Sequence, residues 1–192
     1  MMKGKTKGNP EIVSFEDELL IVVDEQDNPV DYKTKAECHD GEAILHRAFS
    51  LFIFNSEHEL LLQKRSKDKR LWPLYWSNSC CSHPRKGESM ELATQRRLEQ
   101  ELGLRTSLTY LYKFTYFAPF GEKGSERELC WVYIGKSDEQ VQVNPTEIAE
   151  WQYVSIPELN AALESHPENY TPWFKMEWER LQQDFINEIK SM

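Results

Sequence analysis

Short apolar runs separated by turn-forming residues predict most of the strands in this chain of 192 residues. Leu19–Val23 is followed by a polar turn ending at Pro29 and then by Val30, which is typical of a hairpin. A second hairpin is predicted from residues 48–54 and 59–63. Further strands are expected at 109–117, 125–135 and 148–154, the first of them rich in aromatic residues.

Three segments have the pattern of helices. Residues 88–102 contain strong helix formers and neither proline nor glycine, and Gly103 follows as a C-terminal cap. Ser155 and Glu158 have capping-box spacing and predict a short helix. The last helix starts at Thr171-Pro172 and carries an apolar stripe of Phe174, Trp178, Leu181, Phe185 and Ile189. Trp173 lies off this stripe and is either a capping contact or a residue that faces a ligand.

Strands that alternate irregularly with about three helices predict a mixed α/β (α+β) domain, with a sheet covered by helices. A hydrophobic content of 40% with 29% charged residues is that of a globular protein. We expect a flexible basic tail at residues 1–10 and a single domain at 11–192.

The net charge of −9 argues against a nucleic-acid-binding surface. No apolar run is long enough for a membrane span, so we expect a cytoplasmic protein, and we expect it to be a monomer. The cysteines are then free thiols. A structural zinc site of Cys80, Cys81 and His83 is an alternative.

Basic residues gather on both sides of the Cys81 segment: Lys64, Arg65, Lys67, Lys69 and Arg70 precede it, and Arg85 and Lys86 follow it. They are either solubilising surface charges or, as their placement favours, a focused anion site.

Histidines and glutamates form a candidate metal site. His39 and His46 flank Asp40-Gly41, and a turn there would let the two imidazoles converge. Glu126 and Glu128 share one face of a strand and repel each other unless a cation lies between them. Two solvated acids at a strand end are the simpler alternative, but the histidines, with His83 as a third, favour a metal.

The segment from Ser82 to Leu104 resembles the Nudix box, in which a helix supplies carboxylates to divalent ions on a diphosphate. The positions that match are Glu88, Arg96, Leu98, Glu101, Gly103 and Leu104. Ser82, Arg97 and Gln100 depart from the pattern, and the last two replace acids. The resemblance implies a Nudix fold without pyrophosphate hydrolysis, in which Glu101 retains one magnesium. Arg97 and Glu101 alone would read as a solvated ion pair.

The preceding residues, SNSCCSHP, resemble a motif of the type I isopentenyl-diphosphate isomerases, and that resemblance extends over residues 35–173. This family interconverts isopentenyl and dimethylallyl diphosphate and has a degenerate Nudix box. The resemblance implies a zinc, manganese or magnesium site and a second magnesium bound with the diphosphate. The metal ligands would be His39, His46, His83, Glu126 and Glu128.

The same resemblance implies roles in catalysis. Cys81 and Glu128 are the acid/base pair, either of which can be the acid, and Tyr116 relays a proton to Glu128. Trp173 is an aromatic wall for a carbocation. The substrate ligands would be Lys35, Arg65, Lys69, Ser82 and Arg97.

Two other functions remain open. A Nudix hydrolase of a nucleoside or prenyl diphosphate is one, although Arg97 and Gln100 oppose it. A non-catalytic, metal-stabilised interaction domain is the other, and it would leave Cys81 and Tyr116 without a role.

Overall fold

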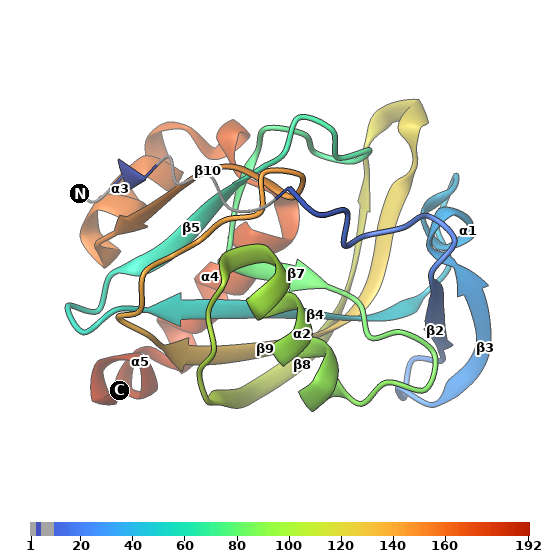
Figure 1. Cartoon of the computed structure of the whole chain (residues 1–192), viewed down its shortest axis with the longest axis horizontal. Coiled ribbons are helices and arrows are strands. Elements are labelled where there is room, and N and C mark those ends of the chain that lie inside the picture. The colour runs from blue at the N-terminus through green and yellow to red at the C-terminus, as the bar shows by residue number, and fades with distance from the viewer. Residues whose placement is uncertain (1–2, 5–9) are drawn as a thin grey trace.

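The computed structural model describes residues 3–4 and 10–192, and in them ten strands form one mixed sheet with helices on both faces (Figure 1). Strand β4 (His46–Phe54) pairs in parallel with β9 (Ser125–Lys136), which pairs antiparallel with β8 (Leu108–Pro119). On its other side β4 pairs with β7 (Cys80–Ser82) and, at His46, with β2 (Leu19–Val23). The two segments expected to carry the chemistry, 80–82 and 125–136, therefore flank the same strand.

The remaining strands extend the sheet on both sides. The predicted hairpin at β2 is confirmed, because β2 pairs antiparallel with β3 (Pro29–Thr34). Strand β10 (Ile148–Val154) has its predicted bounds. It pairs with β5 (Leu60–Arg65), which also pairs with β6 (Trp76–Ser77).

The second predicted hairpin is right only at its turn. Strands β4 and β5 pair at Phe54 and Leu60 and then part. The Ser79 hydroxyl bridges the gap, since it donates to the Leu61 carbonyl at 2.6 Å and accepts from the Ile53 amide at 2.8 Å. The chain around Ser79 is thus inserted between two strands, and this insertion carries Cys81 into the sheet beside β4.

One face of the sheet is covered by α2 (Met90–Leu102), which begins after the capping residue Ser89. The helix ends at Gly103 in the left-handed region, with φ 67°, as predicted. Its Leu98 and Leu102 are fully buried against the side chains of β4 that point to this face.

The opposite face is covered by α3 (Ile156–Ser165), α4 (Pro172–Asp184) and α5 (Ile186–Ser191) (Figure 1). The expectation of one continuous last helix was wrong. Phe185 has φ −128° and ψ 15°, outside the helical region, and its ring stacks on Tyr112 at 5.3 Å. The chain bends there, and Ile189 beyond the bend is still buried in the core.

A short helix that the sequence did not predict, α1 (Lys35–His39), precedes β4 and has a capping box of Thr34 and Glu37. Within the predicted tail, residues 1–2 and 5–9 lie outside the described residues, while Lys3–Gly4 form β1 beside β10. No helix in the described ranges is long and apolar enough to cross a membrane.

Candidate functional site

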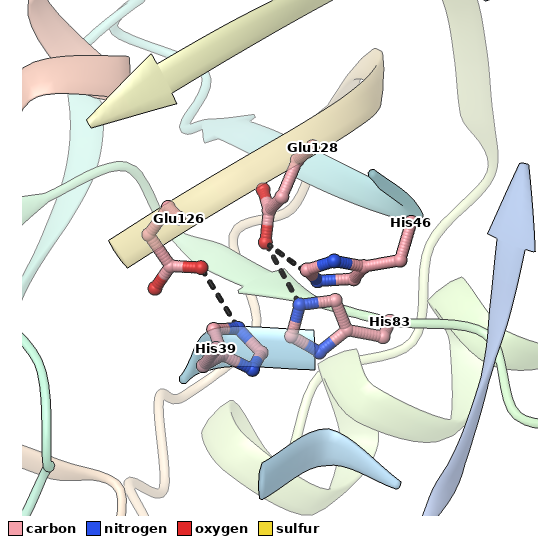
Figure 2. A group of neighbouring side chains, drawn as sticks. All are labelled: His39, His46, His83, Glu126 and Glu128. Carbon is pink, nitrogen blue, oxygen red and sulfur yellow. Dashed lines mark hydrogen bonds and ion pairs between the residues drawn. The ribbon is translucent and has the colours of Figure 1, made fainter. Parts of the chain in front are cut away.

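The side chains of five residues converge on one point beside β9 (Figure 2). Each offers one nitrogen or oxygen atom, and these atoms all lie within 4.8 Å of one another. The residues are His39, His46, His83, Glu126 and Glu128, the set expected from the sequence.

Local structure explains this convergence. Glu126 and Glu128 share one face of β9, and His46 is the parallel register partner of Glu128 on β4. His39 ends α1, and the turn through Gly41, with φ 55°, reverses the chain toward β4. The imidazole rings of His39 and His46 consequently lie 4.8 Å apart, which confirms that a turn brings the two residues together.

Backbone carbonyls fix the tautomers of two histidines. The Nδ1 atoms of His39 and His46 lie 2.7 Å from the carbonyl oxygens of Lys35 and Ile44. A carbonyl only accepts, so each Nδ1 carries a hydrogen, and Nε2 is the atom of each ring left to bind a metal. This is the arrangement by which proteins orient metal-bound histidines.

The atoms that face one another also lack ordinary partners. His46 Nε2 has no hydrogen-bond partner among the described residues. Glu126 Oε2 has no hydrogen bond within the described ranges either, although it lies 2.8 Å from His39 Nε2 and forms an ion pair with it when His39 is protonated. Burial and the neighbouring His39 lower the pKa of His46 to about 3, so its nitrogen is unprotonated. Three imidazoles and two carboxylates fit a divalent metal ion.

A cavity of about 380 Å³ opens beside these ligands. It is lined by all the residues expected to catalyse or to bind substrate, namely Cys81, Glu128, Tyr116, Trp173, Lys35, Arg65, Lys69, Ser82 and Arg97. The structure therefore gathers them in one place, while their individual roles stay predictions.

Cys81 lies on β7 at the wall of this cavity. Burial raises the pKa of its thiol to about 12, although the charge of Arg65 opposes this shift. The Arg65 guanidinium is held by the Trp72 and Leu71 carbonyls at 3.1 and 3.0 Å, and its Nη1 lies 3.8 Å from the Cys81 sulfur. Cys81 is thus a neutral thiol with a fixed cation beside it.

Glu128 belongs to both the metal cluster and the cavity. Its Oε1 lies 2.8 Å from His83 Nε2, and its Oε2 accepts a hydrogen bond of 2.6 Å from the Tyr116 hydroxyl. Burial and the charge of Glu126 raise its pKa well above the usual value. One oxygen of this carboxyl group therefore faces the histidines, and the other faces a phenol.

Trp173 sits in the first turn of α4 and is 3% exposed. Its ring lies 5.2 Å from Trp72 at nearly a right angle and 6.1 Å from Tyr116. Of the two expectations for Trp173, the structure supports contact with a ligand cavity.

Cations gather at another part of the cavity wall. The ammonium group of Lys35 donates to the Ser14 hydroxyl at 2.5 Å, and burial lowers its pKa. Lys69 pairs with Glu147, whose carboxylate also accepts from Arg97 at 3.2 Å. This arrangement provides charge-assisted donors for an anion.

The structure corrects two expectations about the charged residues. Arg97 and Glu101 are not a solvated pair, because both are 2% exposed and Arg97 donates to Glu101 at 2.9 and 2.5 Å. Of the basic residues expected to form an anion site, Arg65, Lys69 and Arg70 line the cavity, whereas Lys64, Lys67, Arg85 and Lys86 do not. Arg85 instead pairs with Glu18, and Lys86 lies over the Tyr32 ring. Glu101 also lies outside the lining, so its magnesium role stays a prediction.

Sequence reasoning missed Glu147 and the segment around Ser14. Glu147 lies in the loop before β10, far along the chain from the lysine and arginine that it joins. Ile12, Ser14 and Glu16 also line the cavity, and the Val13 carbonyl accepts a hydrogen bond from Arg97 at 2.8 Å. In the sequence, residues 12–16 form a short mixture of apolar and polar residues with neither helical nor strand periodicity, so no pattern identified them as part of a site.

Comparison with known proteins defines the class first. A profile of the NUDIX domain matches residues 44–174. DR0079 from Deinococcus radiodurans superposes with a TM-score of 0.64 at 25% identity, covering 77% of this chain and 90% of that one. The MutT protein of Methanosarcina mazei Go1 gives 0.61 at 20% identity, covering 73% and 94%. The fold is that of a NUDIX domain.

Proteins related in sequence identify the family within the NUDIX fold to which this chain belongs. Isopentenyl-diphosphate Delta-isomerase 1 of Photorhabdus laumondii is 40% identical over 174 residues, covering 90% of this chain and 99% of the relative. The Schizosaccharomyces pombe isomerase is 37% identical over 182 residues, covering 83% and 80%. The Arabidopsis thaliana chloroplastic isomerase I is 38% identical, covering 93% and 72%. The chain belongs to the isopentenyl-diphosphate Delta-isomerase family.

Proposed function

We propose that this protein interconverts isopentenyl diphosphate and dimethylallyl diphosphate. The observation that carries the proposal is the shared cavity, in which a thiol and a carboxyl group, Cys81 and Glu128, accompany an aromatic ring and a set of cations. Its family relatives carry the same activity in their names.

The reaction moves a carbon–carbon double bond. An unactivated alkene is protonated to a tertiary carbocation, and a proton then leaves a neighbouring carbon, so two acid/base groups must reach the substrate. Cys81 and the Glu128–Tyr116 pair supply these groups from β7 and from β8–β9. One group must begin protonated and the other ionised, so that the proton leaving the carbocation has a base to receive it. Burial raises the pKa of both the thiol and the carboxyl group, so either can be the protonated partner.

Trp173 and its aromatic neighbours serve the intermediate. A cation over a desolvated indole face is stabilised by roughly 2 kcal/mol. The ring is 3% exposed and is packed by Trp72 and Tyr116, so water is excluded from this part of the cavity. Exclusion matters because water would trap the carbocation.

The diphosphate is bound by the cations on the cavity wall, Lys35, Lys69 and Arg97, with Arg65 and Ser82 beside them. A magnesium ion would accompany the diphosphate on Glu101. His39, His46, His83, Glu126 and Glu128 would hold a zinc, manganese or magnesium ion, whose contribution when bound is to fix the Glu128 carboxyl group and to offset its charge.

An enzyme that binds a small, water-soluble diphosphate needs no contact with a membrane or a nucleic acid. The net charge of −9 on the protein is consistent with the absence of a nucleic-acid partner. We propose a cytoplasmic monomer. No described helix could cross a membrane, which agrees with that proposal.

Hydrolysis is the competing function, and one assay separates the two. The metal-loaded protein is incubated with isopentenyl diphosphate and magnesium, and both isomer and free phosphate are measured. We expect dimethylallyl diphosphate without phosphate release. Phosphate without isomer would show that the degenerate box still hydrolyses. No reaction with any diphosphate would support an interaction domain.

A further inference from the structure

Three buried polar atoms on α4 lack hydrogen-bond partners among the described residues. One is the amide nitrogen of Gln182, and the other two are the indole nitrogen Nε1 of Trp173 and the carboxyl oxygen Oε2 of Glu177. Trp173 is 3% exposed and Glu177 is fully buried. An unpaired buried group of this kind costs about 1–3 kcal/mol, so a pair of them calls for a physical explanation.

The two groups are complementary. An indole N–H only donates, and a carboxyl group accepts. Trp173 and Glu177 are one helical turn apart on the same face of α4, where side chains four residues apart are neighbours. Side chains of a helix lean toward its N-terminus, so the side chain of Glu177 is directed toward the turn that begins at Trp173.

The other carboxyl oxygen of Glu177 ties the helix to the sheet. Oε1 lies 3.5 Å from the Cys130 sulfur on β9, two residues from Glu128, and Ser50 on β4 also hydrogen-bonds to the carboxyl group. Burial raises the pKa of Glu177 to about 8, although these two contacts oppose the shift. The group is therefore uncharged at neutral pH, and with the proton on Oε1 the other oxygen, Oε2, is the carbonyl oxygen that accepts. Glu177 is therefore anchored beneath the cavity without bringing a charge to it.

The Trp173 ring is already held on its other sides. Trp72 packs against it at 5.2 Å and 88°, Tyr116 at 6.1 Å, and the Arg65 guanidinium lies over it at 5.3 Å. These contacts restrain the faces of the ring, whereas its N–H edge has no hydrogen-bond partner among the described residues. An acceptor at that edge would fix the rotation of the ring and increase its electron density, which strengthens attraction for a cation.

We propose that Glu177 is a positioning residue for Trp173, whose indole N–H it accepts through one bridging water molecule. The bond holds the indole face toward the reacting carbons. The chemical purpose of this bond rests on the isomerase function proposed above, whereas the bond itself does not.

Nuclear magnetic resonance of the indole groups tests the bond without any assay of activity. The chain has six tryptophans, and Trp173→Phe removes one indole N–H resonance and so assigns it. We expect Glu177→Leu to move the Trp173 resonance upfield more than any other indole resonance. Glu177→Gln keeps an acceptor and should leave that resonance near its original place. Glu179→Gln, an exposed neighbour on α4, should move none. An unmoved Trp173 resonance in Glu177→Leu would overturn the proposal.

Kinetics test what the bond does. Glu177→Leu should lower kcat about tenfold with KM changed less than about twofold, and Glu177→Gln should recover most of the loss. A misplaced ring should also let water add to the carbocation, with loss of a proton, so that more tertiary alcohol diphosphate forms. Lower stability with an unchanged kcat and product ratio would contradict this role. If the unaltered protein shows no isomerase activity, the proposed function fails and the resonance test still decides the bond.

Discussion

Tyr116 and Glu128 are direct register partners on the antiparallel strands β8 and β9, and the Tyr116 hydroxyl donates to the Glu128 carboxyl group at 2.6 Å. The pairing of β8 with β9 places the two side chains next to each other, so the contact does not depend on the conformation of a loop. Because the other oxygen of Glu128 faces the histidines, changes at the two residues should separate proton transfer from metal binding.

Tyr116→Phe should therefore lower kcat by roughly 10²-fold and leave the metal content unchanged. Glu128→Gln should abolish turnover and also lower metal content. Kinetics and elemental analysis of the same preparations measure both effects. Loss of metal in Tyr116→Phe would contradict the separation.

Removal of a predicted metal ligand should empty the site. We expect zinc or manganese to co-purify with the protein, and His39→Ala or Glu126→Gln to lower metal affinity by 10²-fold or more, since each ligand atom lies within 4.8 Å of the others. His166→Ala is the control, because that imidazole is 66% exposed. Unchanged metal content in both variants would rule out the assignment.

The neighbouring cysteines offer a matched test of the catalytic thiol. Cys81 lines the cavity, whereas Cys80 is fully buried against α2. Cys81→Ala should abolish turnover and keep fold and metal. Cys80→Ala should cost about 1 kcal/mol of stability and keep activity. Turnover that persists in Cys81→Ala would remove Cys81 from the mechanism.

Gly124 should be needed to hold His39. A Cβ atom there would lie 2.2 Å from the His39 carbonyl oxygen, and φ is 130°, where side chains are strained. Gly124→Ala should lower stability by roughly 3 kcal/mol and weaken metal binding. Gly121→Ala is the control, because Gly121 also has positive φ, 57°, with open space around it, and should cost about 1 kcal/mol. Equal effects of the two changes on metal binding would contradict this account.

The ion pairs of Glu147 predict a pH dependence of stability. Burial alone would raise the pKa of Glu147, but the charges of Lys69 and Arg97 lower it from 4.5 to about 2. Because the pKa of Glu147 is lower in the folded protein than in the unfolded chain, its carboxylate stabilises the fold at pH values above 4.5. This contribution, about 3 kcal/mol, is lost as the pH falls from 4.5 toward 2.

Glu147→Gln should thus be about 3 kcal/mol less stable than the unaltered protein at neutral pH, and the gap should close toward pH 2. Urea unfolding at several pH values measures this. Glu150→Gln is the control, because its side chain is 51% exposed and pairs with Lys64 at the surface. A pH-independent gap would refute the assignment to Glu147.

The sequence predicted elements whose cause is local. The composition of α2, its glycine cap and the alternation along β9 are written in neighbouring residues, and they place Glu126 and Glu128 on one face. The histidines could be predicted because a turn and a family motif mark them. The break at Phe185 could not, because a helical stripe continues through it and the ring leaves the helix to stack on Tyr112.

The partners of buried charges were also out of reach. Glu147 meets Lys69 only after β10 pairs with β5, and Glu177 meets Cys130 only after α4 packs on the sheet. Neither acid has a local pattern that distinguishes it from the many exposed glutamates of this chain. Tertiary packing, and not sequence spacing, brings them to the site.

Deuterium incorporation tests the central claim most directly. Metal-loaded protein is incubated with isopentenyl diphosphate and magnesium in heavy water, and the products are followed by proton NMR. If Cys81 and the Glu128–Tyr116 pair transfer protons through a carbocation, dimethylallyl diphosphate must form with deuterium bound to carbon. Isomer formed without deuterium, or no isomer at all, would contradict the mechanism.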